Sequence, residues 1–136
     1  MSTLIAGSLG GTLMGLIFVA HVSVLLTFRP PKALARRASE GTVTGIAMFG
    51  SVAALMLWTL LGAGSAFLFR AIESNYPTSL PSVPSALYTG LVAWAAVLTA
   101  VPAAVFMRDR LWHLLAEYAL FIGIFGWLVP LLVKAV

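Results

Sequence analysis

Four long runs of apolar residues divide the chain, and three short stretches between them hold most of its charged and proline residues. The runs cover about residues 4–28, 43–69, 86–107 and 111–133. A helix of roughly 20 apolar residues crosses a hydrocarbon core about 30 Å thick, so each run is long enough to span a membrane. The pattern predicts an all-α membrane protein, a bundle of four transmembrane helices.

The connections predict how these helices are paired. The third connection, residues 108–110, is so short that the two helices it joins must return antiparallel. Asp109 is expected to cap the fourth helix, because an Asp side chain accepts hydrogen bonds from the free amides of a first turn. A proline-containing loop over residues 29–40 joins the first two helices. We therefore expect two antiparallel hairpins that form a single domain over residues 1–136.

One proline lies inside a predicted helix. Pro102 falls near the end of the third apolar run. Because proline has no backbone N–H, the carbonyl near Leu98 loses its partner, and a kink is expected there. The hydroxyl of Thr99 could form a hydrogen bond with the backbone nearby.

The composition agrees with a membrane protein. Of 136 residues, 61% are hydrophobic and 9% are charged, whereas roughly a quarter of the residues in soluble domains are charged. The four runs use up most of the chain, so no folded soluble domain is expected. The chain has no Cys, which excludes disulfides, thiolate metal sites and thiol catalysis.

The basic residues predict how the helices are oriented. The formal net charge is +4, and the first and third loops hold most of the Lys and Arg side chains: Arg29, Lys32, Arg36, Arg37, Arg108 and Arg110. Cytoplasmic loops are enriched in such residues, so both loops should face the cytoplasm and both termini the non-cytoplasmic side. We expect a multi-pass protein of a bacterial-type inner membrane or an equivalent one. Loops this short offer no basic surface for nucleic acid, and none is expected to bind.

The aromatic residues fit the same orientation. Tyr76 and Tyr88 near the outer boundary and Trp112 near the inner one match the aromatic belts of membrane interfaces. The other tryptophans are interpreted as packing or lipid-facing residues: Trp58, Trp94 and Trp127.

A strip of glycines lies along the first helix. Gly7, Gly11 and Gly15 recur at four-residue spacing, with Gly10 beside them. Small residues let helix backbones approach closely in lipid, where the hydrophobic effect does not drive helices together. The strip predicts either close packing within the chain or an interface with another subunit, identical or not.

His21 is the first candidate for chemistry. It lies eight residues before Arg29, hence about 12 Å inside the predicted boundary at the rise of a helix. It shares a helical face with Gly10 and Met14 and should point into the bundle. It could be a neutral histidine bonded to a neighbour, a ligand of haem, pigment or quinone, or a group in a proton pathway.

Glu117 is the second candidate. It follows His113 by one helical turn and lies at nearly the depth of His21. An ionised carboxylate at mid-helix costs about 2.5 to 3.5 kcal/mol, so a partner or a bound proton is expected. Glu117 could pair with His113 or loop arginines, pair with His21, or bind a coupling ion or another subunit. Its own helical stripe is bulky and lies opposite Gly126, which argues against pairing with His21.

The motifs of self-contained enzymes are missing. The sequence has no glycine-rich phosphate loop, no zinc-binding histidine pattern, no serine nucleophile elbow and no acidic pair for acid–base work. Catalysis by the chain alone is not expected, and no catalytic residue or metal ligand is predicted. His21, His113 and Glu117 are candidates for an ion or proton pathway.

Three roles follow from these features. The preferred hypothesis is an accessory subunit of a larger membrane complex, in particular one of respiratory or photosynthetic electron transfer, held by the glycine strip. The alternative is a homo-oligomeric transporter or channel for an ion or small solute. The third is a membrane subunit that binds haem, quinone or pigment, with His21 as the ligand. The expected partners are membrane lipid and other integral membrane subunits.

Overall fold

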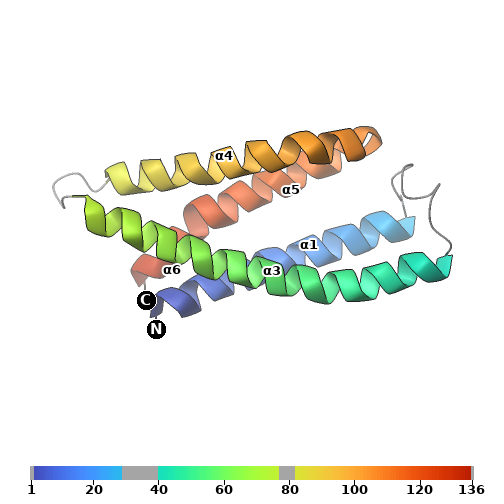
Figure 1. Cartoon of the computed structure of the whole chain (residues 1–136), viewed down its shortest axis with the longest axis horizontal. Helices are drawn as coiled ribbons and strands as arrows, with labels where there is room; N and C mark the ends of the chain where they lie inside the picture. The colour runs from blue at the N-terminus through green and yellow to red at the C-terminus, as the bar shows by residue number, and fades with distance from the viewer. Residues whose placement is uncertain (1, 29–39, 77–81, 136) are drawn as a thin grey trace.

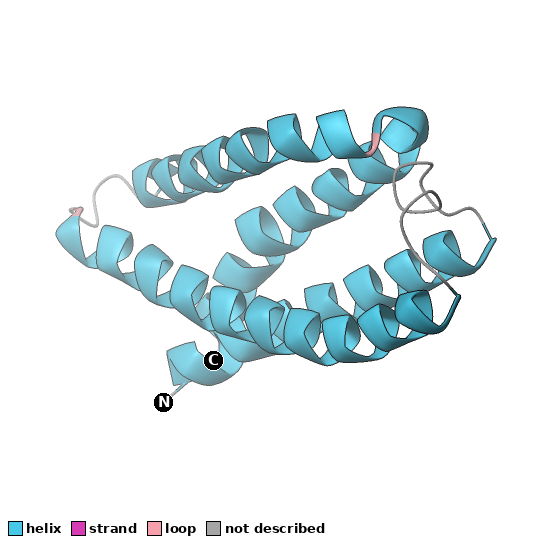
Figure 2. Cartoon of the chain, turned by 45° about the vertical axis from the view of Figure 1, so that its right-hand side comes forward, coloured by secondary structure: helices cyan, strands magenta, loops and turns pink. Residues whose placement is uncertain are grey.

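The computed structural model describes residues 2–28, 40–76 and 82–135, and these are almost entirely helical. The elements are α1 (Ser2–Phe28), α3 (Glu40–Asn75), α4 (Ser82–Phe106), the 3-10 turn η1 (Arg108–Arg110), α5 (Leu111–Gly123), the π-helical segment η2 (Ile124–Leu128) and α6 (Val129–Ala135) (Figure 1). Figure 2 shows α4 and α5 on one side of the bundle and α1 and α3 on the other.

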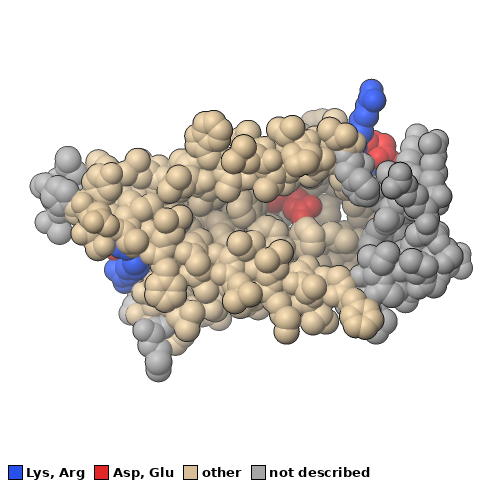
Figure 3. Space-filling view, viewed as in Figure 1, with Lys and Arg blue, Asp and Glu red and all other residues tan. Residues whose placement is uncertain are grey.

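Within the described residues, four helical stretches are long and apolar enough to cross a membrane: Ser2–Leu25, Phe49–Asn75, Val83–Val105 and Arg108–Ala135. Large apolar side chains cover their outer faces, with Phe49 85% and Val105 79% exposed. Figure 3 shows one face that is almost free of charged side chains between its ends. Surfaces of this kind fit contact with lipid rather than water. The predicted all-α architecture is confirmed, with four helices long and apolar enough to span a membrane.

The second helix extends past its predicted end near residue 69 and reaches Asn75. Polar side chains support the added turns. Arg70 forms a salt bridge of 2.9 Å with Glu73, and the amide of Asn75 donates a hydrogen bond to the carbonyl of Ala71. Arg70 also donates to the carbonyl of Val133, at 2.9 Å, where a cation meets the free carbonyls at the end of α6.

The turn before α5 differs from the prediction for Asp109. Residues Arg108–Arg110 form a 3-10 turn, so the position preceding α5 falls on Arg110, and no side chain caps the helix there. The expectation that Asp109 caps the fourth helix is therefore wrong. The reason is the tighter winding of η1, which holds Asp109 inside the turn rather than at the helix start.

The fourth membrane-crossing stretch is not a regular α-helix. The N–H of Val129 bonds to the carbonyl of Ile124, five residues back, which is π-helical spacing. The next residue, Pro130, has no N–H to donate. The carbonyl of Phe125 is thus left without a backbone donor, and the hydroxyl of Tyr88 on α4 donates to it instead.

The glycine strip of α1 is filled by other helices of the same chain. A Cβ built on Gly7 would lie 2.5 Å from the carbonyl oxygen of Gly62, and one on Gly15 would lie 3.2 Å from the Cβ of Trp58. Gly11 meets the same stretch of α3, and a Cβ on Gly10 would lie 2.6 Å from Val129. Only glycine permits such close approach between backbones.

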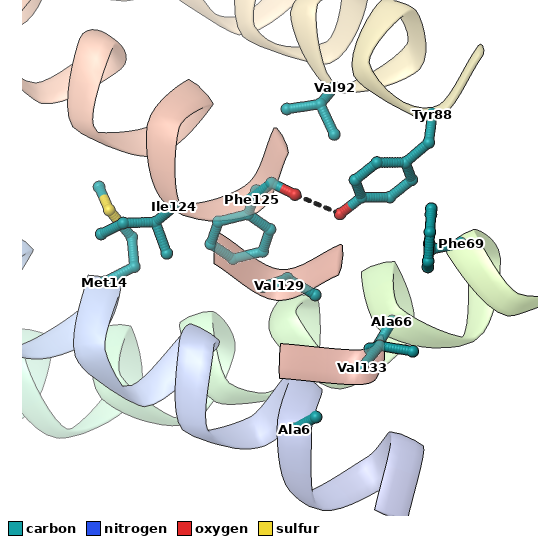
Figure 4. Close-up of a cluster of buried hydrophobic side chains, with 10 residues drawn as sticks. All are labelled: Ala6, Met14, Ala66, Phe69, Tyr88, Val92, Ile124, Phe125, Val129 and Val133. Atoms are coloured by element: carbon teal, nitrogen blue, oxygen red, sulfur yellow. Dashed lines mark hydrogen bonds between the residues drawn. The ribbon is translucent and has the colours of Figure 1, made fainter. Parts of the chain in front are cut away.

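The buried core draws on all four membrane-crossing stretches (Figure 4). Its members are Ala6 and Met14 of α1, Ala66 and Phe69 of α3, Tyr88 and Val92 of α4, Ile124 and Phe125 of η2, and Val129 and Val133 of α6. Tyr88 is 0% exposed, so its assignment to an interfacial aromatic belt is wrong. Trp112, by contrast, is 83% exposed at the other end of the bundle. The unpaired carbonyl of Phe125 explains why a tyrosine hydroxyl is drawn into the core.

Candidate functional site

A cavity of about 840 Å³ lies between α4 and the other helices. Its walls run from Met14 to Leu25 on α1, from Trp58 to Leu68 on α3, and from Tyr88 to Met107 along α4 and the turn after it. The stretch from Leu114 to Phe125 supplies the fourth wall. The volume falls in the range of about 300 to 1,000 Å³ that small-molecule sites occupy.

Five aromatic rings form a connected row beside this cavity. The ring of Phe18 lies 5.8 Å from that of Trp58, and Trp58 lies 5.5 Å from Phe121, centroid to centroid. Phe121 stacks on Phe125 at 5.0 Å and meets Tyr118 edge to face at 6.3 Å. Aromatic rings arranged in this way offer flat apolar faces to a ligand.

The hydroxyls in the wall bond to neighbouring protein atoms. Tyr118 donates to the hydroxyl of Thr99 at 3.0 Å, and Thr99 donates to the carbonyl of Ala95 at 2.9 Å. Ser65 donates to the carbonyl of Gly62 at 3.1 Å. Thr99 was expected to form a hydrogen bond with the backbone nearby, and it does so with the carbonyl of Ala95, one turn earlier in the helix. These three hydroxyls are thus already hydrogen-bonded within the fold.

Glu117 is different, because its carboxylate is an unpaired polar group in an apolar wall. It is the only charged side chain among the described residues that line the cavity. Within the same residues it forms no hydrogen bond or ion pair. Figure 3 shows an acidic side chain inside the hollow of this face. An ionisable side chain within a membrane-spanning segment is by default a hypothesis for a functional site, and Glu117 is the candidate here.

The two histidines lie together, and each neighbours in sequence a residue that lines the cavity, Val22 or Leu114, although neither lines it itself. The rings of His21 and His113 meet edge to face, 5.2 Å between centroids. The Nε2 atom of His21 is buried and has no hydrogen-bond partner within the described part of the chain. The structure therefore brings His21 to His113, with no hydrogen bond between Glu117 and either ring. No group of three or more potential metal ligands occurs among residues 2–28, 40–76 and 82–135.

The cavity contains residues to which the sequence analysis gave other roles or none, because Tyr88 was assigned to an aromatic belt, Trp58 to packing or lipid, and Tyr118 was not considered. Trp58, Tyr118 and Tyr88 come from three helices, and their side chains converge only in the fold. The sequence held one sign of the position of Tyr88, which is Pro130. A proline within a helix leaves a backbone carbonyl without a donor, and a hydroxyl from another helix can supply one. The four strip glycines contact α3 and α6 and line no part of the cavity.

Comparisons with protein-family models, curated protein sequences and solved structures give no significant match.

Proposed function

We propose that this protein is a membrane subunit that binds one elongated, mainly apolar molecule in the cavity between α4 and the other helices. The supporting observation is the cavity itself, which has the volume of a small-molecule site and walls of aliphatic and aromatic side chains. Among the predicted roles, this corresponds to the binding of a quinone, pigment or related molecule. The row of rings from Phe18 to Tyr118 supports it, since flat conjugated ligands stack on aromatic faces.

The other two predicted roles stay predictions. The accessory-subunit hypothesis depended on the glycine strip, whose residues contact α3 and α6 of the same chain. The transporter hypothesis retains one supporting feature, the acidic side chain of Glu117 in a cavity lined by all four membrane-crossing stretches. The cavity supports binding directly and flux only indirectly, which is why binding is preferred.

We also propose the arrangement of the helices in the membrane. Two antiparallel hairpins, α1 with α3 and α4 with α5 to α6, place the turn at residues 108–110 in the cytoplasm and both termini on the opposite side. The support is the concentration of basic residues in the first and third connections. Among the described basic residues, Arg108 lies in the third connection. Arg70 lies near the C-terminal end of α3, on the side that this orientation places opposite to Arg108.

A labelling experiment tests this orientation. Because the chain has no Cys, a single introduced cysteine reports the side on which it lies. Ser74→Cys should react with a membrane-impermeant maleimide added to intact cells, whereas Arg108→Cys should react only after the membrane is permeabilised. Reaction of Arg108→Cys in intact cells, with Ser74→Cys protected, would reverse the proposed orientation.

Ligand binding can be measured through Trp58, which lines the cavity. Replacement of the three other tryptophans by phenylalanine leaves Trp58 as the sole reporter; Trp94, Trp112 and Trp127 are all more than half exposed. A neutral alkylated benzoquinone added to this protein in lipid nanodiscs should quench its fluorescence saturably. Ala95→Phe should weaken that quenching about tenfold or more, because the added ring fills the space at the wall.

The matched control is Ala86→Phe. Ala86 lies on the same helix and is exposed, but it does not line the cavity. This variant should bind the quinone as the parent does. Equal quenching of the Ala95→Phe and parent proteins would show that the quinone quenches Trp58 from the bilayer. Native mass spectrometry of the purified protein identifies what fills the cavity, and lipid acyl chains as the sole occupant would contradict the proposed function.

A further inference from the structure

We propose that the cavity selects lipophilic cations, with the carboxylate of Glu117 as the counter-charge and the aromatic row as the second contact. This proposal rests on the proposed function, because it names the class of ligand for the same cavity. Among the described residues that line the cavity, Glu117 is the only one with a charged side chain.

The free energy of the carboxylate supports a cationic ligand. An isolated ionised carboxylate within a bilayer is unfavourable, because it loses its hydration without gaining a partner. Within the described chain no Lys, Arg or His side chain forms an ion pair with Glu117. A ligand cation at this position supplies the missing partner in surroundings of low dielectric constant, where the attraction is stronger than in water. A neutral ligand leaves the carboxylate unpaired, and an anion adds repulsion.

The rings beside Glu117 favour the same ligands. Phe121 lies one helical turn after Glu117, and both line the cavity. Phe121 is in turn stacked on Phe125 and in contact with Trp58. Trp and Phe faces attract cations through the ring quadrupole, and the attraction is stronger where water is excluded. An organic cation with apolar substituents can thus contact Glu117 and the rings together.

Few other titratable groups face this position. Among the described lining residues, α4 contributes Tyr88 and α5 contributes Tyr118, whereas α1 and α3 contribute none. His113 lies one turn before Glu117 on its own helix and contacts His21 of α1, so a histidine pair borders the site. Protons compete with the cation for the carboxylate of Glu117. Cation binding should therefore weaken as the pH falls.

The experiment measures equilibrium binding of radiolabelled tetraphenylphosphonium to the full chain in nanodiscs. Glu117→Gln keeps the shape of the side chain but removes its charge, and Glu117→Asp keeps the charge. We expect Glu117→Gln to bind the cation about tenfold more weakly, with no pH dependence, and Glu117→Asp to retain most of the affinity. In a separate measurement without the cation, radiolabelled tetraphenylborate, an anion of the same shape, should show no saturable binding to the wild-type protein.

The matched control is Glu73→Gln, which makes the same chemical change at a residue paired with Arg70 outside the cavity. It should bind tetraphenylphosphonium as the wild type does. Equal affinity for the cation in the wild type and Glu117→Gln, or saturable binding of tetraphenylborate by the wild type, overturns the cation proposal. In either case, saturable quenching of Trp58 by the neutral quinone would leave the proposed function intact, and its absence would remove both.

Discussion

The replacement of Gly62 by alanine should lower the free energy of unfolding by about 3 kcal/mol, near the upper end for overpacked sites. A Cβ on Gly62 would lie 2.6 Å from both the Cα and the N of Gly11. These are backbone atoms of a facing helix, so no side-chain rotation can relieve the overlap. α1 and α3 must separate, and the hydrogen bond of 2.9 Å between Thr12 and Thr59 is stretched with them.

Reversible unfolding in mixed micelles with increasing sodium dodecyl sulfate, followed by circular dichroism, measures this change. Gly50→Ala is the control, because Gly50 is on the same helix and a Cβ there meets no atom of the described residues within 4 Å. It should leave stability unchanged or raise it slightly, since alanine favours helix over glycine. Similar stability of the Gly62→Ala and Gly50→Ala proteins would contradict the close helix contact.

The second large effect is expected for Tyr88→Phe, which should lower the free energy of unfolding by about 1 to 3 kcal/mol. The substitution keeps the ring in the core but removes the hydroxyl that donates to the carbonyl of Phe125. That carbonyl has no backbone donor in η2, because Val129 bonds to Ile124 and Pro130 has no N–H. A buried acceptor is then left unsatisfied, which is more costly than the loss of one bond between solvated groups.

A double-mutant cycle with Pro130→Ala tests the cause. Alanine restores an N–H at position 130, so the carbonyl of Phe125 regains a donor within the helix. Tyr88→Phe should then be at least about 1 kcal/mol less destabilising in the Pro130→Ala protein than in the wild type. Tyr118→Phe serves as the control, because that hydroxyl bonds to Thr99 at an exposed position. Equal effects of Tyr88→Phe in both backgrounds would show that Pro130 and Tyr88 act independently.

The four membrane-crossing helices could be predicted from the sequence because hydrophobic length alone identifies them. Their ends were less predictable. The extension of α3 to Asn75 depends on contacts such as the bond from Arg70 to the carbonyl of Val133, which joins residues distant in sequence. The third helix contains Pro102 and continues past it to Phe106, and the kink expected there stays a prediction. Irregular π-helical winding occurs before Pro130, which the sequence analysis did not anticipate.

The candidate site was predictable in part. Glu117 could be identified from its depth in an apolar helix, because a carboxylate there demands an explanation. The pairing of His21 with His113 could not, since it depends on the relative rotation of two helices. Trp58 is one of four tryptophans, and nothing in its sequence position separates the one that lines a cavity from those that face lipid. Side-chain convergence of this kind follows from helix packing rather than from local pattern.

The close contact of α1 with α3 also limits how this sequence can diverge. Positions that face lipid accept any apolar side chain, so overall identity between relatives can decline quickly. Gly7, Gly11 and Gly62 cannot change in the same way, since each backbone stands where a side chain of the other helix would have to be. A pair of small residues four apart in one helix, with a third small residue in the next long helix, should therefore be retained among relatives. This pattern would indicate common ancestry after ordinary sequence similarity has been lost.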